Sequence, residues 1–350
     1  MMEDPDERPD RWRLGDRIDN RYEIIKIRHG GMGVLYICFD AQTKEPVGIK
    51  TLKEDFVKSC SAVMRSELIE QFKQQVEAWV SLGYHPNVVQ ALSLKEIEGK
   101  PYVLVEYVAG NGEYGVDLLG WIRWGGLQVR GQPDIPLILN FSIQFCHGMI
   151  YAESKFKEMG RPFVHRDIKP SNILITRDGV VKIADFFLAK TMTGQFEGKV
   201  SGTPAYMSPE QWSGSSIDIR SDIYSFGCVL YQMVTGKPPF TAVNFVDYKK
   251  CHLNVIPESL DVDEDLKKII LKCLEKDPGN RYKDFVEVKM LLSSVYYKLT
   301  GEAVPLLCHK STGKEAPLSN RHKTITLHQN LDSGDTLEAI TGDFTDSLKE

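Results

Sequence analysis

One short polar stretch of the chain has side chains of the types, and at the spacing, that phosphoryl transfer needs. The stretch reads HRDIKPSN and places a carboxylate (Asp167), an ammonium (Lys169) and an amide (Asn172) at offsets of zero, two and five. A carboxylate can orient an attacking hydroxyl, an ammonium can neutralise charge on the moving phosphoryl group, and an amide can hold a metal ion. The stretch therefore predicts a site of phosphoryl transfer.

Two further segments supply groups that bind phosphates. The run RHGGMG lies between two strand-like runs, and Gly30 and Gly33 let backbone amides approach phosphate oxygens without a Cβ in the way. The run VGIK begins seventeen residues after Gly30 and ends at Lys50.

The elements that must position these groups fall into a β-rich part and a helical part. Alternating apolar residues and turn glycines predict four strands, at 22–28, 34–40, 46–52 and 102–108. Apolar residues at three- and four-residue spacing predict an amphipathic helix over 61–82. Beyond Gly110 one hairpin with its turn at 177–179 interrupts a helical pattern. The apolar helical segments are 137–152, 221–235, 264–276 and 284–298.

With these motifs, the stretch from about Tyr22 to Leu299 resembles the eukaryotic-like (bacterial-type) Ser/Thr protein kinase family. The resemblance implies an α+β, two-lobed protein kinase fold with a small β-rich N-lobe and a larger α-rich C-lobe. It implies ATP and Mg²⁺ as cofactors, with Lys50 on the α- and β-phosphates. By the same resemblance Asp167 orients the substrate hydroxyl, and Lys169 stabilises the transferred phosphoryl group.

The resemblance also places the remaining parts of the ATP site and the boundaries of the lobes. Glu106 and Val108 belong to the connection between the lobes and are expected to bind ATP, while Asn172 and Asp185 hold the metal. The expected divisions are a flexible leader over 1–20, an N-lobe over 21–107, a C-lobe over 108–299, a linker over 300–317 and a C-terminal helical segment over 318–350.

Three family positions carry altered residues. Arg28 replaces the first of the three loop glycines, and Phe187 replaces the glycine of Asp-Phe-Gly. If Trp79 is the apolar spine residue of the helix, the glutamate that would pair with Lys50 is replaced by Gln75. Glutamine lacks the charge-assisted bond, which is roughly twice as strong as a neutral one. We expect a looser helix and weaker ATP alignment rather than loss of activity.

The resemblance extends to a regulatory and substrate-seating segment. Kinases with an arginine at the position of Arg166 often use a phosphate on the activation segment to order it. The candidate phosphosites are Thr191, Thr193 and Ser201. The segment 202–210, GTPAYMSPE, matches the one that seats the acceptor residue of the substrate. Four scaffold residues are expected to hold these loops, namely His165, Glu210, Asp222 and Arg281.

Bulk properties exclude several other classes of protein. A net charge of −5 gives no broad basic field for nucleic acid, and the seven scattered cysteines form no CxxC pair. The charged opening has no apolar core, so we expect no signal peptide, and the most apolar runs are too short for a membrane span. We expect a cytoplasmic protein with protein substrates.

The last fifty residues fall outside the kinase resemblance. Within 318–350 the run GDTLEAITGDFTDSL resembles the second half of a tetratricopeptide repeat, which predicts a helical hairpin that contacts a protein partner. A truncated repeat array, a helix pair docked on the kinase and a disordered tail remain alternatives. For the whole chain, the main prediction is a Ser/Thr protein kinase. The alternative is a pseudokinase or impaired kinase that acts as a nucleotide-binding scaffold.

Overall fold

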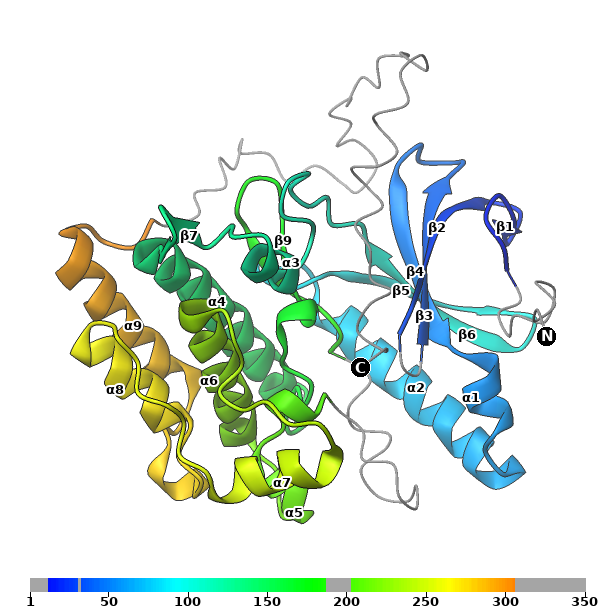
Figure 1. The fold of residues 1–350 in the computed structure, drawn as a ribbon. Coiled ribbons are helices and arrows are strands. Elements are labelled where there is room, and N and C mark those ends of the chain that lie inside the picture. The colour runs from blue at the N-terminus through cyan, green and yellow to red at the C-terminus, as the bar shows by residue number, and fades with distance from the viewer. Residues whose placement is uncertain (1–11, 31–32, 187–202, 306–350) are drawn as a thin grey trace, which may run out of the picture.

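The first lobe is a six-stranded antiparallel sheet that carries one long helix (Figure 1). The computed structural model describes residues 12–30, 33–186 and 203–305. In this sheet the strand order is β1-β2-β3-β4-β6-β5. The strands are β1 (Arg17–Ile18), β2 (Tyr22–His29), β3 (Gly33–Asp40), β4 (Pro46–Leu52), β5 (Ala91–Ile97) and β6 (Lys100–Glu106). The four strands predicted for this part are present, and β1 and β5 are added to them.

Strand β1 corrects the prediction of a flexible leader over residues 1–20. Arg17 and Ile18 pair with Glu23 and Tyr22 of β2, and Ile18 is completely buried. A charged, proline-containing composition predicted mobility, but one apolar side chain in a paired strand is enough to anchor this part of the segment.

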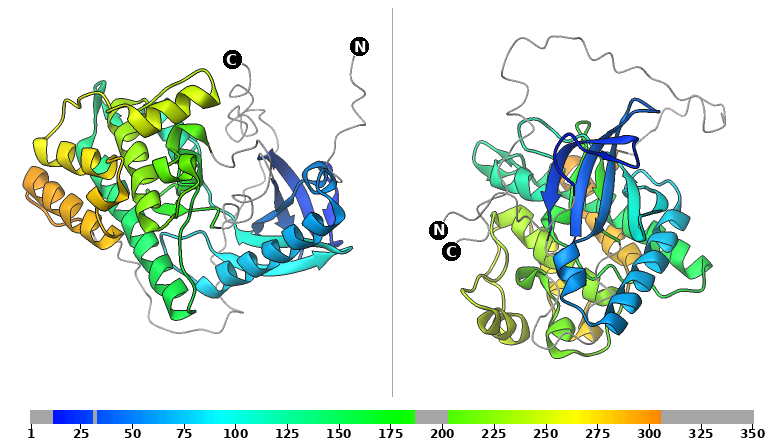
Figure 2. Two further views of the ribbon diagram at one scale, coloured as in Figure 1. Left: turned by 90° about the horizontal axis from the view of Figure 1, so that it is seen from below. Right: turned by 90° about the vertical axis from the view of Figure 1, so that its right-hand side faces the viewer.

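The helix α2 (Ala62–Leu82) follows a short helix α1 (Glu54–Lys58) and covers one face of the sheet. The Ser61 hydroxyl accepts a hydrogen bond from the Met64 amide, which satisfies one of the free donors at the helix start. Gly83 ends the helix with φ +71°, a conformation that glycine adopts without strain. The predicted helix over 61–82 is therefore confirmed, and its C-terminal end lies beside the second lobe (Figure 2).

The second lobe is mainly helical, as predicted. Its helices are α3 (Leu118–Arg123), α4 (Ile135–Glu158), α5 (Pro209–Ser213), α6 (Ile219–Thr235), α7 (Phe245–Asn254), α8 (Glu264–Cys273) and α9 (Phe285–Thr300). Three 3₁₀ turns accompany them, η1 (Pro170–Asn172), η2 (Pro204–Tyr206) and η3 (Pro278–Asn280). Two short hairpins pair β7 (Gln128–Val129) with β8 (Gln132–Pro133) and β9 (Ile173–Ile175) with β10 (Val181–Ile183). The hairpin of β9 and β10 has its turn at the predicted position.

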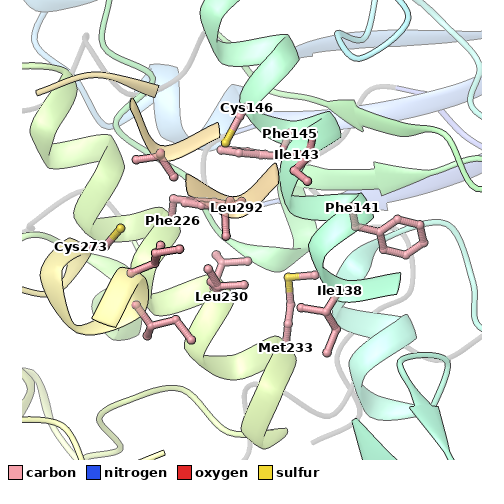
Figure 3. Close-up of a cluster of buried hydrophobic side chains, with 14 of the residues drawn as sticks. Ile138, Phe141, Ile143, Phe145, Cys146, Phe226, Leu230, Met233, Cys273 and Leu292 are labelled. Carbon is pink, nitrogen blue, oxygen red and sulfur yellow. The ribbon is translucent and has the colours of Figure 1, made fainter. Parts of the chain in front are cut away.

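The core of this lobe forms where α4, α6 and α9 meet (Figure 3). The rings of Phe145 and Phe226 stack at 4.8 Å between their centroids, and Phe285 packs edge-on against both. Such aromatic contacts add to the stabilisation that burial of these large side chains already gives. This rigid helical body holds the loops that are described below.

Helix α4 is longer than its apolar pattern predicted. It has 24 residues rather than the sixteen of 137–152, and among the described residues it alone is long and apolar enough to cross a membrane. Its most apolar window is 61% buried inside the lobe. Packing in the protein core therefore accounts for its composition.

Several predicted features lie outside the described residues. These are Phe187, the candidate phosphosites Thr191, Thr193 and Ser201, and the C-terminal segment 318–350.

Candidate active site

The stretch HRDIKPSN, residues 165–172, is the catalytic loop of the resemblance, and helix α6 holds it in place through Asp222. Both oxygens of the Asp222 carboxylate accept backbone hydrogen bonds, from His165 at 2.6 Å and from Arg166 at 2.8 Å. Burial raises the pKa of Asp222 to about 7, and these two amides oppose that shift because they favour the charged carboxylate. Arg166 has φ +68°, an uncommon backbone conformation that this clamp holds. The contact predicted for Asp222 is present.

The three polar groups of this stretch converge. The Lys169 ammonium lies 2.9 Å from Asp167 Oδ2, and the Asn172 side-chain amide donates to the same oxygen at 2.9 Å. That amide also donates to the Asp167 carbonyl at 2.8 Å. Both N–H bonds of Asn172 are thus used, so its oxygen remains as an acceptor. The side chains of Asp167 and Lys169 are 18% and 22% exposed, which leaves room for a substrate to approach.

Lys50 and Asp185 join the two lobes across the site. The Lys50 ammonium on β4 lies 2.6 Å from Asp185 Oδ1, which follows β10 in the second lobe. Burial alone would raise the pKa of Asp185, but the charges of Lys50 and Lys169 and the hydrogen bond from Lys50 outweigh it and lower that pKa. Asp185 therefore stays ionised and can act as an oxygen ligand.

A column of rings fixes the register of helix α2. Phe186 packs against Trp79 of α2 at 6.2 Å and against His165 at 5.1 Å between centroids. The Trp79 indole also donates to the Val89 carbonyl at 2.8 Å. Because Trp79 contacts Phe186, it holds the spine position that the sequence assigned to it. Gln75, one helical turn earlier, then occupies the position that would face Lys50.

The altered residues differ in what surrounds them. Gln75 is half-buried and makes no side-chain hydrogen bond to another described residue, while Lys50 pairs with Asp185 instead. Arg28, at the end of β2, feels the charge of Asp117, the residue that caps helix α3 in the opposite lobe. Burial lowers the pKa of Arg28, and the charge of Asp117 partly offsets this.

The glycines of the first hairpin have structural reasons besides phosphate binding. A Cβ at Gly33 would lie 3.0 Å from the Thr51 carbonyl oxygen, closer than side chains normally approach. The Gly30 amide donates to the Gly33 carbonyl at 2.8 Å and closes the turn. Gly33 pairs with Leu52 and so lies beside β4, the strand that carries Lys50.

The connection between the lobes contains an ion pair that the sequence did not predict. Lys182 of β10 lies 2.8 Å from Glu106 Oε1 at the end of β6, and both side chains are largely shielded from solvent. The same oxygen accepts a hydrogen bond from the Gln90 amide at 2.8 Å. Val108, the other residue of this connection expected at the ATP site, is 8% exposed. One indication of this pair was present in the sequence, because Lys182 stands between apolar residues of a β-strand and a buried lysine needs a partner.

The substrate-seating segment is braced by a buried ion pair and by contacts to the catalytic loop. Arg281 makes two parallel bonds to the Glu210 carboxylate, at 2.7 and 2.9 Å, as predicted for this pair. Gln211 in helix α5 donates to the Arg166 carbonyl at 3.0 Å. This bond fixes helix α5, and with it the end of the segment 202–210, relative to the loop that carries Asp167.

Comparisons with known proteins agree with this arrangement. A family model described as the protein kinase domain matches residues 23–296. A probable serine/threonine-protein kinase of Clostridium acetobutylicum is 34% identical over 291 residues, which cover 81% of this chain and 41% of that protein. Serine/threonine-protein kinase PknB of Mycolicibacterium smegmatis is 32% identical over 332 residues, which cover 88% of this chain and 48% of that protein.

The chain therefore spans less than half the length of these curated relatives. The family model covers most of the chain, from β2 to α9, and the two-lobed fold agrees with it. This chain belongs to the protein kinase domain family.

Proposed function

We propose that this chain is a Ser/Thr protein kinase, which transfers the γ-phosphoryl group of MgATP to a hydroxyl of a protein substrate. The convergence of Lys169 and Asn172 on the Asp167 carboxylate carries the proposal, because these groups then meet around one reacting hydroxyl. The Lys50–Asp185 pair joins the first lobe to the second at the same site.

In this proposal the protein acts mainly by positioning and by electrostatics. Asp167 accepts a hydrogen bond from the substrate hydroxyl and takes up its proton as the oxygen bonds to phosphorus. The bond between that phosphorus and the β-phosphate oxygen breaks, and ADP leaves with the electron pair. Lys169 offsets negative charge on the moving group, while Lys50 holds the α- and β-phosphates.

The oxygen donors available here fit magnesium. No group of three or more His, Cys, Asp or Glu residues in the described ranges is arranged to hold a metal ion alone. Mg²⁺ commonly binds through one or two protein oxygens and completes its shell with phosphates and water. Asp185 and the oxygen of Asn172 match that donor set. When bound, the ion would neutralise charge on the β- and γ-phosphates.

Three observations bear on substrate, regulation and compartment. The braced segment 203–210 suits a protein chain as acceptor, and the relatives above are named serine/threonine-protein kinases. Burial lowers the pKa of Arg166, so a phosphate on Thr191, Thr193 or Ser201 would stabilise its charge. The described cysteines, such as Cys146 and Cys228, are free thiols, which supports a reducing, cytoplasmic compartment.

The test is transfer of labelled phosphate from MgATP to the chain itself and to myelin basic protein, with Asp167→Asn run beside the wild type. We expect incorporation that falls by at least about a hundredfold in the variant, because general-base positioning typically contributes that much. Nucleotide binding without transfer by the wild type would instead support the alternative, a nucleotide-binding scaffold. Intact Lys50, Asp167, Asn172 and Asp185 favour the kinase.

A further inference from the structure

A histidine in the second lobe lies directly beneath the substrate-seating turn and is not used by the chemistry above. His252 belongs to α7, which lies beside α5 (Figure 1) and also contacts η2. Its side chain is completely buried. Its ring packs against Phe240 at 5.0 Å and Trp212 at 6.1 Å between centroids. Histidine is seldom placed so deeply unless both ring nitrogens have a use.

One ring nitrogen has an evident partner. The Tyr224 hydroxyl lies 2.9 Å from His252 Nδ1, and this hydroxyl makes no other hydrogen bond within the described part of the chain. Burial raises the pKa of Tyr224 far above its ordinary value, so this hydroxyl keeps its proton. A buried hydroxyl needs an acceptor for that proton, and only Nδ1 offers one. Tyr224 is therefore the donor and Nδ1 the acceptor.

This assignment fixes the state of the other nitrogen. Burial first, then the nearby charge of Lys276, lowers the pKa of His252 to about 3, so the ring is neutral at neutral pH. A neutral imidazole carries one proton, and because Nδ1 accepts, the proton is on Nε2. His252 Nε2 is buried and has no partner with full hydrogen-bond geometry.

The Pro204 carbonyl acts on the His252 ring as a backbone hydrogen-bond acceptor and raises the pKa of His252, against the larger effect of burial. Because Nδ1 already accepts from Tyr224, Nε2 is the ring nitrogen left for this carbonyl. Pro204 is the first residue of η2. Among the described residues, its carbonyl otherwise accepts only from the Met207 amide, at a long 3.5 Å. The Pro204 carbonyl can therefore accept a further hydrogen bond, because a backbone oxygen has two lone pairs.

The rest of the turn is already tied to helix α6. The Tyr206 hydroxyl donates to Gln232 at 2.6 Å, and Ser225 donates to the Tyr206 carbonyl at 2.8 Å. Both bonds hold the end of η2 and leave its beginning at Pro204 to α7. His252 is the buried polar side chain of α7, the helix that packs against this turn.

We propose that His252 is a positioning residue for the protein substrate: its Nε2–H holds the Pro204 carbonyl and so sets the height of the turn on which the substrate chain rests. This inference rests on the proposed kinase function. It predicts an effect on the protein substrate and none on ATP.

Two substitutions at the same position separate the hydrogen bond from packing. His252→Phe keeps a ring but has no donor, whereas His252→Gln can place an N–H near the Nε2 position. In His252→Phe the KM for myelin basic protein rises about fivefold, the size expected for one neutral hydrogen bond. Its kcat and its KM for ATP stay within about twofold of wild type. In His252→Gln the KM for the protein substrate returns to within about twofold.

Tyr224→Phe is the matched control, because it disturbs the same buried cluster but does not alter His252 itself. Without the Tyr224 hydroxyl, the Pro204 carbonyl is the acceptor left at the ring, and it keeps the proton on Nε2. Its melting temperature falls while its KM for the protein substrate stays within about twofold of wild type. Equal KM values in His252→Phe and His252→Gln would overturn the inference, since the donor would then not matter.

Hydrogen exchange of residues 203–207 reports on the same contact without any activity. We expect faster exchange there in His252→Phe and not in His252→Gln. If exchange is faster in His252→Phe but the wild type transfers no phosphate, the contact exists and the proposed kinase function is wrong. Unchanged exchange in both variants, with an active wild type, would reject the contact and leave the kinase function standing.

Discussion

Lys50 has one carboxylate partner in this structure, Asp185, and helix α2 offers it Gln75 where the family has a glutamate. Asp185 is also the carboxylate expected to bind the metal. We therefore expect Lys50 and Mg²⁺ to compete for one carboxylate, since position 75 supplies no second negative charge, and we expect this competition to weaken the site.

Gln75→Glu relieves the competition. A second carboxylate draws the Lys50 ammonium toward α2 and frees Asp185, so the Mg²⁺ concentration for half-maximal phosphate transfer falls about threefold. Charge-assisted pairs of this kind are about twice as strong as the neutral bond a glutamine could make. The control is Gln74→Glu, which adds the same charge on the exposed neighbouring position. If both variants shift the magnesium requirement alike, net charge and not pairing is responsible.

A second residue-scale prediction concerns Asp40 at the end of β3. Arg21 binds its carboxylate through two bonds, at 2.7 and 2.6 Å, and the Gln42 amide adds a third. The Arg21 hydrogen bond, above all, lowers the pKa of Asp40 from 3.8 to about 2. A depressed pKa means stability that is complete above about pH 4 and lost as the pH falls toward 2; here it amounts to about 2 kcal/mol.

Asp40→Asn should therefore lower the free energy of unfolding at pH 7 by about 1–2 kcal/mol, with a smaller deficit at pH 2.5. Urea unfolding at pH 7, 4 and 2.5 measures this difference. Asp19→Asn, whose carboxylate pairs with Lys95 at the surface, is the control and should change stability by well under about 1 kcal/mol. A deficit that stays constant with pH would show that the charge of Asp40 is not the cause.

At the scale of elements, sequence patterns predicted those whose apolar spacing is strong. Helix α2 and the hairpin of β9 and β10 form where expected. The contact of Trp79 with Phe186 agrees with the spine position that the family resemblance suggested for Trp79. The patterns missed β1, because two residues carry no period. They also missed Lys182, whose partner Glu106 is distant in the sequence and meets it only when the lobes are joined.

The Lys182–Glu106 pair links β10, which leads to Asp185, with the end of β6. Lys182→Met leaves a partly shielded Glu106 with only the Gln90 amide, so we expect a loss of about 1–3 kcal/mol in stability. Because Glu106 begins the connection expected at the adenine site, the KM for ATP also rises. Chemical denaturation and ATP titration measure the two effects.

Lys155→Met is the matched control for this prediction. Its ion pair with Glu158 lies at the surface of α4, where such pairs contribute little. Lys182→Arg, which keeps a charge, should recover part of the stability. An equal loss in Lys155→Met and Lys182→Met would mean that burial of the Lys182–Glu106 pair has no importance.

At the scale of the whole molecule, each lobe has a core of its own. One cluster fills the helical lobe, and the sheet packs against α2 on one face and around residues such as Tyr22 and Tyr102 on the other. The two-lobed architecture was predictable from the change of period near Gly110. How the lobes meet was not, because it depends on contacts such as Lys50–Asp185 between residues 135 apart in sequence.

A ligand that binds both lobes should therefore stabilise the molecule as a unit. At a hundred times its Kd, MgATP adds about 2.7 kcal/mol to the free energy of unfolding, which raises the melting temperature by about 5 °C or more. Removal of Mg²⁺ with a chelator should reduce this shift, because ATP then lacks the ion that connects its phosphates to Asp185. Thermal unfolding with ATP alone and with MgATP measures the difference.

Two variants, one in each lobe, test which residues produce this rise in melting temperature. Asp185→Asn keeps the shift given by ATP alone and loses the increment from Mg²⁺, whereas Lys50→Met reduces both, since it removes the cation from the phosphates. Asp167→Asn serves as the control and retains the full shift, because Asp167 orients the acceptor hydroxyl and leaves the nucleotide to Lys50 and Asp185. If Mg²⁺ still raises the melting temperature of the ATP-bound Asp185→Asn variant, the metal does not bind at Asp185. The nucleotide would then not connect the two lobes through that residue.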